Sequence, residues 1–309
     1  MLRALASGAG CVYPDSVEQI VSIIGPTLFA IALGYIFGRM SRASTAPMVN
    51  VTMYVATPCL VFSSVYSSTI VIRDAAKMWA SCLLIMAGTF VVAWIVFGLV
   101  WKKHTALYLP IVFMNTINIP LPIIKLAFGD AGVAQTMLFY IPYALLINSL
   151  AVYVASGQKG FRSGLGAMLR TPLIYAVVLG LVLNLAGAVL PKVVTEAVGL
   201  VGDAAVPLML LVLGMTIGQI RLSEIPATVV ASVIRVGVGF SLGLFAVWLF
   251  GFTGIPRAVV LFEAAMPSAV FTSVLASRYQ NEAELVSSVV LATTLMGLAV
   301  IPALVYCLT

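Results

Sequence analysis

Two proline-containing stretches hold most of the side chains in this sequence that could bind a small ligand. The first, residues 113–124, reads FMNTINIPLPII and lies inside an apolar segment long enough to cross a bilayer. Its polar and helix-breaking residues are Asn115, Thr116, Asn118, Pro120 and Pro122. Proline lacks a backbone N–H, and a membrane helix is normally broken only where protein or a water-filled cavity satisfies the freed backbone groups. The stretch therefore predicts a binding site near the bilayer midplane, or alternatively a packing kink whose asparagines bond to neighbouring helices.

The second stretch, residues 261–272, reads LFEAAMPSAVFT and contains Glu263. An ionised group near the bilayer centre is expensive, so such groups usually face a cavity, an ion or a partner. Pro267 frees the carbonyl of Glu263 from its helical hydrogen bond, and Ser268 and Thr272 add hydroxyl oxygens. Carboxylate, carbonyl and hydroxyl oxygens together suit a hard cation such as sodium. The alternatives are that Glu263 carries a proton, or that it forms a structural ion pair with a basic residue.

Two basic residues also lie inside apolar spans. The long side chains of Arg235 and Lys125 can lie along apolar surface while their charged ends reach the membrane interface. A structural role is therefore expected for both. Either could instead attract an anionic substrate or pair with Glu263. Broken helices also supply positive charge without charged side chains, because the N-terminus of a half-helix has free N–H groups and a partial positive charge. Two such breaks favour an organic anion as ligand, with a co-transported cation beside it.

The composition defines the class of protein that must position these residues. The chain has 309 residues, of which 62% are apolar and 8% are charged, against about 25% charged residues in a soluble domain. Its apolar runs last about twenty residues, the length of a membrane-spanning helix, whereas a membrane β-barrel has shorter, alternating strands. We therefore predict an all-α membrane protein in contact with lipid. The net charge of +6 is explained by topology and does not indicate a nucleic-acid partner.

The sequence lacks the residue combinations that catalysis or metal binding would need. Four cysteines without ligand-like spacing and a single histidine at a helix end give no metal site. An intramembrane hydrolase would need a Ser–His, Ser–Lys or paired-aspartate arrangement inside the spans. His104 lies at an interface, and no span holds two aspartates. We therefore expect no enzyme and no cofactor other than a coupling ion, either sodium or a proton.

Ten membrane spans can be read along the chain, joined by short loops. Their ranges are 17–37, 47–66, 78–101, 105–128, 133–155, 172–190, 197–219, 227–250, 256–277 and 285–308. Loops after the odd-numbered spans carry nine lysines and arginines, against five on the opposite face. Loops rich in basic residues face the cytoplasm, so both termini are predicted to lie outside.

Four prolines recur at nearly one offset in the two halves of the chain. The pairs, at offsets of 146 to 149 positions, are Pro26 with Pro172, Pro110 with Pro256, Pro120 with Pro267, and Pro58 with Pro207. Five spans in each half make the second copy insert upside down, and inverted repeats with equivalent broken helices are typical of secondary transporters. We therefore predict a first repeat over residues 1–155, a cytoplasmic connection over 156–171 and a second repeat over 172–309.

Along nearly its whole length the sequence resembles the auxin efflux carrier family, within the wider bile acid/sodium symporter superfamily. The motifs that carry the resemblance are MNTINIPLPI followed by FGDAG, then FEAAMPSAVFTSVLASRYQ, TPCLVFSS and GDAAVPLMLLVLG. The resemblance implies ten spans in two inverted five-helix repeats, with spans 1, 2, 6 and 7 as a scaffold and spans 3–5 and 8–10 as a moving core. It also implies that broken spans 4 and 9 cross at the midplane beside the substrate, that the core moves elevator-fashion, and that scaffolds join in a homodimer.

Carried over by position, the resemblance puts Asn115, Pro120 and Pro267 at the crossing. It puts Glu263 with Met266 where sodium-coupled relatives bind an ion. Near the start of the third span, where plant carriers have a secondary polar site, the loosely matching residues are Asp74 and Lys77. The long central loop of many plant carriers is absent, so the chain resembles short bacterial members, whose proposed substrates include dicarboxylates. The resemblance therefore implies a bacterial inner-membrane protein but does not identify auxin as the substrate.

These observations predict a secondary active transporter of small mono- or dicarboxylates, coupled to sodium or protons. The predicted substrate site comprises Asn115, Thr116, Asn118, Pro120, Pro267 and Ser268. The predicted ion site, with a sodium near the carboxylate, comprises Glu263, Met266 and Thr272. The alternatives are an uncoupled auxin-like anion carrier and a ligand-binding membrane sensor without turnover, which uptake into liposomes distinguishes.

Overall fold

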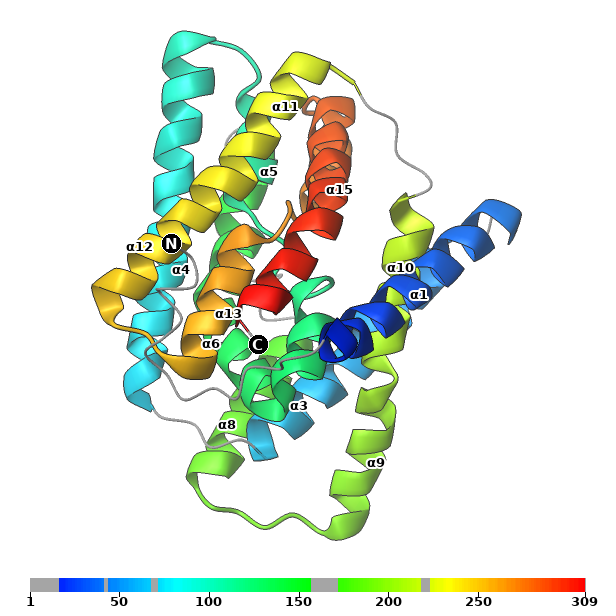
Figure 1. Ribbon diagram of the computed structural model, residues 1–309. Coiled ribbons are helices and arrows are strands. Elements are labelled where there is room, and N and C mark those ends of the chain that lie inside the picture. The colour runs from blue at the N-terminus through cyan, green and yellow to red at the C-terminus, as the bar shows by residue number, and fades with distance from the viewer. Residues whose placement is uncertain (1–16, 42–43, 68–71, 157–171, 218–222, 309) are drawn as a thin grey trace.

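The computed structural model describes residues 17–41, 44–67, 72–156, 172–217 and 223–308 (Figure 1). Throughout these residues the chain is helical and forms no strand. A single isolated antiparallel β-bridge within them joins Met114 to Ser268. The predicted all-α architecture is therefore confirmed for the part of the chain that the structure describes.

The helices follow one another with few long connections. The first half contains α1 (Val17–Ser41), α2 (Ala46–Val51), η1 (Thr52–Ala56), α3 (Thr57–Ser67), α4 (Ile72–Ala93), η2 (Trp94–Val100), η3 (Thr105–Leu107), α5 (Tyr108–Val112) and α6 (Pro120–Ser156). The second half contains α8 (Pro172–Leu185), α9 (Lys192–Asp203), α10 (Ala205–Ile217), α11 (Ile225–Val233), η4 (Ile234–Val238), α12 (Gly239–Phe250), α13 (Gly254–Ala265), α14 (Val270–Arg278) and α15 (Ala283–Leu308). η1, η2 and η4 are π-helical turns that continue α-helices, and η3 is a 3₁₀ turn.

α1 packs along α10, and two glycines make the close approach feasible. A Cβ at Gly34 would collide with the carbonyl oxygen of Leu211, and a Cβ at Gly214 would collide with the carbonyl oxygen of Ile31. Small residues allow such direct backbone contact in membrane helix pairs. In Figure 1 these two helices lie side by side at one edge of the molecule.

α3 joins the same group of helices by packing on α8 and α9. Tyr66 near its end donates a hydrogen bond to the carbonyl of Ala188 at 2.9 Å and accepts one from the N–H of Leu190 at 3.1 Å. The side-chain amide of Asn184 donates to the carbonyl of Tyr66 at 2.7 Å. Because α10 also contacts α2 and η1, these helices form one group, the outer group (α1, α2, η1, α3, α8, α9 and α10).

The remaining helices form a second group, the inner group (α4–α6 and α11–α15, with η2–η4). α13 packs on α4, α6 and α12, and α15 packs on α11, α13 and α14. The largest hydrophobic cluster runs through the two interrupted stretches and includes Phe113, Met114, Phe262 and Met266. In Figure 1, α5, α6, α13 and α15 lie together in the body of the molecule.

Six helices among the described residues are long and apolar enough to cross a membrane. They are Ala46–Ser67, Ala75–Val100, Pro120–Ile147, Lys192–Met215, Ile225–Phe250 and Ala283–Leu308. The other expected spans coincide with α1, with the shorter helix α8 and with the two interrupted stretches. Ten spans in two inverted repeats therefore stay a prediction, and most of the predicted cytoplasmic connection, residues 157–171, lies outside the described residues.

Candidate functional site

The first break lies between α5 and α6. α5 ends at Val112, Phe113 is extended with φ −96° and ψ 104°, and α6 begins at Pro120. Proline suits the first position of a helix, since its missing N–H has no helical partner there in any case. The expectation that Pro120 and Pro122 interrupt a helix therefore differs from the structure in detail, because they open the second half-helix and the interruption precedes them.

The second break lies between α13 and α14. α13 ends at Ala265, and Met266 is extended with φ −65° and ψ 147°. Ala269 is also extended, with ψ 129°, and α14 begins at Val270. Pro267 lies inside this extended stretch, so here the proline occupies the interruption itself, as the sequence predicts.

The two breaks are bonded to each other through their main chains. The N–H of Asn115 donates to the carbonyl of Pro267 at 2.7 Å, and the N–H of Ala269 donates to the carbonyl of Phe113 at 2.9 Å. These bonds flank the antiparallel bridge between Met114 and Ser268. The backbone groups that each interruption frees are thus satisfied by the other, which is the condition for breaking a helix inside a membrane.

Side chains reinforce this pairing from neighbouring helices. The hydroxyl of the fully buried Ser268 donates to the carbonyl of Pro110 at 2.6 Å, and its N–H donates to the hydroxyl of Thr293 on α15 at 3.1 Å. The hydroxyl of Tyr143 on α6 donates to the carbonyl of Met114. Sequence reasoning missed both Thr293 and Tyr143, because nothing in a helix of mixed apolar and small polar residues indicates which side chain faces a distant break.

The predicted substrate residues of the first break are nearly all buried. Asn115 and Thr116 are 3% and 2% exposed, and Asn118 is half-buried. The side-chain oxygen of Asn115 accepts a hydrogen bond from the N–H of Asn118 at 3.0 Å. The amide nitrogen of Asn115 has no partner, although buried polar groups nearly always have one. Asn115 therefore offers an unused donor beside the paired breaks.

Glu263, on the last turn of α13, is fully buried. Neither of its carboxyl oxygens has a hydrogen-bond partner. Met266 and Thr272, predicted to share the ion site, are also fully buried, but the hydroxyl of Thr272 donates to the carbonyl of Ala269 at 2.6 Å. Within the described part of the chain no group of three or more His, Cys, Asp and Glu side chains could hold a metal ion.

Arg235 contradicts the expectation that it carries its charge outward to the interface. It lies in η4 and is fully buried. Its two terminal nitrogens donate to the carbonyl of Ile111 at 3.0 Å and to the carbonyl of Ala264 at 2.7 Å. These carbonyls belong to the last turns of α5 and α13, so one guanidinium joins the two half-helices that lead into the breaks.

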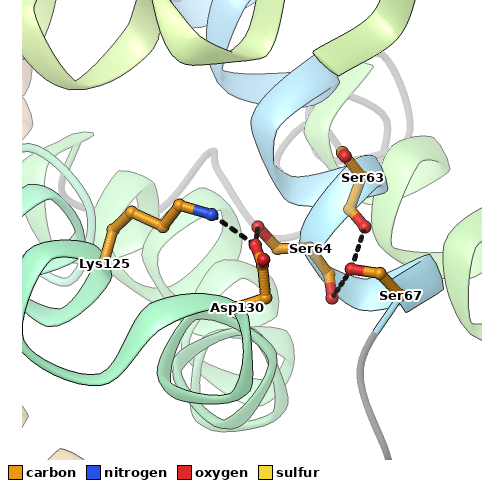
Figure 2. A network of polar contacts seen from close by, with 5 residues as sticks. All are labelled: Ser63, Ser64, Ser67, Lys125 and Asp130. Carbon is orange, nitrogen blue, oxygen red and sulfur yellow. Dashed lines mark hydrogen bonds and ion pairs between the residues drawn. The ribbon is translucent and has the colours of Figure 1, made fainter. Parts of the chain in front are cut away.

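Lys125 forms an ion pair instead of reaching toward an interface or toward Glu263. Its ammonium group contacts the carboxylate of Asp130, which also accepts a hydrogen bond from the hydroxyl of Ser64 at 2.7 Å (Figure 2). Asp130 follows Gly129, whose φ of 62° bends α6 at this point. The network links α6 in the inner group to α3 in the outer group.

The weakly predicted secondary polar site is not assembled by the described residues. Lys77 donates to the carbonyl of Phe250 at 3.0 Å, and its ammonium group lies 6.0 Å from the centre of the Phe252 ring. Cations near the last carbonyls of a helix are stabilising, so this contact is a helix-end interaction with α12. Asp74 lies in α4, but its side chain falls outside what the structure describes.

A small apolar cavity of about 20 Å³ lies where the two groups of helices meet. Its lining residues come from α1, α10, α6 and α15 and from the end of the first break; they are Thr27, Leu28, Ile31, Ile119, Ile123, Leu210, Leu213, Thr294, Leu298, Ile301 and Pro302. None of the predicted site residues lines it. Ile119 and Ile123 bring it next to the first break along the chain, but a volume of about 20 Å³ has room for a single water-sized group.

The fold and the site define an all-helical membrane protein with two mutually bonded breaks, and the comparisons agree with transport. Residues 163–307 match a family described as membrane transport protein. The chain is similar to an uncharacterized transporter of Methanothermobacter thermautotrophicus, at 28% identity over 303 residues that cover 94% of this chain and 98% of the relative. It is also similar to an uncharacterized transporter of Methanocaldococcus jannaschii, at 25% identity over 289 residues that cover 89% of this chain and 94% of the relative. Both relatives are archaeal, so the narrower resemblance to short bacterial members stays a prediction.

Proposed function

We propose that this chain is a secondary active transporter of small organic anions that works by elevator-type alternating access. One observation carries the proposal. Two broken helices bond to each other and leave the amide nitrogen of Asn115 and the carboxyl group of Glu263 buried without partners. Unpartnered buried polar groups beside broken helices are the arrangement that transporters use to bind substrates and coupling ions. The matched family description and the names of both relatives support transport as the activity.

The charges around the breaks favour an anionic substrate. α6 and α14 begin directly after the paired stretches, and the N-terminus of each carries a partial positive charge. The amide nitrogen of Asn115 can donate to a carboxylate, and Arg235 adds a full positive charge nearby. Small mono- or dicarboxylates are therefore the proposed substrates.

The packing of the two helix groups supports movement of one past the other. The small cavity between the groups has almost entirely aliphatic walls, whereas the hydrogen bond from Ser64 on α3 to Asp130 on α6 would have to break during such a movement. In this account the outer group is the scaffold, and the inner group, which holds both breaks, is the moving core. We further propose a homodimer joined through the scaffold, a location in the bacterial inner membrane, and both termini outside.

Glu263 is the proposed coupling residue. Its carboxyl group can bind a sodium ion as a carboxylate or carry a proton as an acid. An uncoupled carrier would need neither, but it would leave the buried, unpartnered carboxyl group without a role. The ion site and the substrate site would then move together, because both sit on the paired breaks.

Uptake into liposomes that contain the purified full chain tests the proposal. Labelled acetate, benzoate, succinate and malate would be supplied under an inward proton gradient, an inward sodium gradient or neither, with protein-free liposomes as the control. We expect at least one acid to accumulate, and accumulation to fall in the Asn115→Ala variant. Specific binding without accumulation by a folded protein would instead indicate a sensor.

A further inference from the structure

Arg235 is the largest of the fully buried side chains in the described structure. Its two terminal nitrogens each donate to the end of a different half-helix, through the carbonyls of Ile111 and Ala264. The C-terminal end of a helix carries free carbonyls and a partial negative charge. In transporters with broken helices, such carbonyls are where a coupling sodium ion binds. In this chain the guanidinium of Arg235 already donates hydrogen bonds to the carbonyls at both helix ends.

The helix around Gly239 packs closely against the guanidinium of Arg235. Gly239 lies one turn beyond Arg235, and a Cβ added there would meet the guanidinium and would approach the carbonyl oxygen of Ala264 to 2.6 Å. Glycine at this position therefore allows the contact between Arg235 and α13. A larger residue would displace the guanidinium.

The other oxygens near Glu263 already take part in hydrogen bonds that hold the breaks together. The hydroxyls of Ser268 and Thr272 donate to main-chain carbonyls, and the carbonyl of Glu263 accepts from the N–H of Met266 at 3.2 Å. The carboxyl group of Glu263, in contrast, makes no hydrogen bond. Arg235 and Glu263 are the buried charged residues that the structure describes, and the guanidinium stays positive whether or not Glu263 carries a proton. A sodium ion bound beside the guanidinium would place two positive charges against at most one carboxylate, which is costly in a membrane interior.

We propose that the guanidinium of Arg235 is a resident cation that takes the place of sodium at the paired breaks, so that this chain binds and transports its substrate without sodium. The transport part rests on the proposed function, whereas the occupation of the cation position does not. Of the two coupling ions considered above, the proton is then the one that Glu263 can carry. The charged and titratable groups that face Glu263 among the described residues are Arg235, Cys82 on α4 and Tyr143 on α6.

Ion-specific stability tests the proposal without knowledge of the substrate. The thermal unfolding midpoint of the purified full chain would be measured in equal concentrations of sodium, potassium and choline chloride, together with binding of radioactive sodium. We expect the same midpoint in all three salts and no bound sodium. A sodium-specific rise that disappears in Glu263→Gln would overturn the proposal.

Two substitutions at Arg235 sharpen the test. Arg235→Gln removes the charge and exposes both carbonyls beside Glu263, so we expect a lower midpoint that sodium, but not choline, partly restores. Arg235→Lys keeps the charge and should be stable and insensitive to sodium. Ser241→Ala, at an exposed serine of α12, is the control for an ordinary substitution on this helix.

An Arg235→Gln protein with one midpoint in all three salts would contradict the view that the guanidinium fills a cation site. If Arg235→Gln fails to fold, the wild-type chain and Arg235→Lys still test the proposal. A sodium-specific rise in the unfolding midpoint of either protein would overturn it. A failure to detect uptake of any acid would count against the proposed transport and would leave these stability results standing.

Discussion

Replacing Asn115 by alanine separates a role in substrate binding from a role in folding. The side chain is 3% exposed and makes one hydrogen bond, from the N–H of Asn118 to its oxygen at 3.0 Å. Losing that bond costs about 1 kcal/mol of unfolding free energy. Alanine also removes the buried amide nitrogen that has no partner, and leaving such a group unsatisfied costs about 1–3 kcal/mol. The two effects oppose each other, so the unfolding free energy should stay unchanged or rise by up to about 2 kcal/mol.

Binding should weaken even though stability does not fall. A hydrogen bond to a charged carboxylate contributes about 1.5–3 kcal/mol, so Asn115→Ala should raise the Kd of the transported acid roughly tenfold to 150-fold. Equilibrium binding of the labelled acid and thermal unfolding of the same preparation measure both quantities. Asn184→Ala is the matched control, because its amide donates to the carbonyl of Tyr66 at 2.7 Å in the outer group. That control should lose stability and keep its affinity. An unchanged Kd in folded Asn115→Ala would refute the reasoning.

Three further predictions concern Glu263, the contact between α1 and α10, and the oligomeric state, the last of which rests on the family resemblance alone. Glu263→Gln should fold, because an amide is as neutral as the protonated acid that we propose and neither carboxyl oxygen has a hydrogen bond to lose, and its uptake should no longer depend on pH; a loss of about 3–5 kcal/mol of unfolding free energy would instead indicate a structural ion pair with Arg235. Gly214→Val should lower the unfolding midpoint, since a Cβ there meets the carbonyl of Ile31, whereas Gly199→Val, with nothing within 4 Å of its Cβ, should change it little. Mass measurement in mild detergent should give a dimer, and a fully active monomer would contradict that expectation.

The class of fold and the position of both breaks follow from the sequence because both depend on local chemistry. Apolar runs of membrane-spanning length predict an all-helical membrane protein. Asn115 near Pro120, and Glu263 near Pro267, are local combinations that a continuous apolar helix does not tolerate without a reason. The structure shifts the first interruption to the residues before Pro120, since proline fits the start of a helix.

The partners of charged residues could not be predicted, because they depend on which helices pack together. Arg235 was expected to reach the interface, and its contacts with Ile111 and Ala264 exist only once η4 lies against both half-helices. Lys77 similarly bonds the carbonyl of Phe250, far away in the sequence. Lys125 and Asp130 are close in sequence, and the signal for their pairing was present in the five-residue spacing and the intervening Gly129.

Counterflow tests the central claim most directly, because it requires one binding site that faces each side of the membrane in turn. Liposomes containing the full chain would be loaded with an unlabelled carboxylate and diluted into the labelled acid without ion gradients. We predict transient accumulation of label above its equilibrium level by the wild-type chain and a strongly reduced overshoot by Asn115→Ala. The absence of an overshoot for every mono- and dicarboxylate tested, with a folded and correctly inserted protein, would contradict transport at the paired breaks.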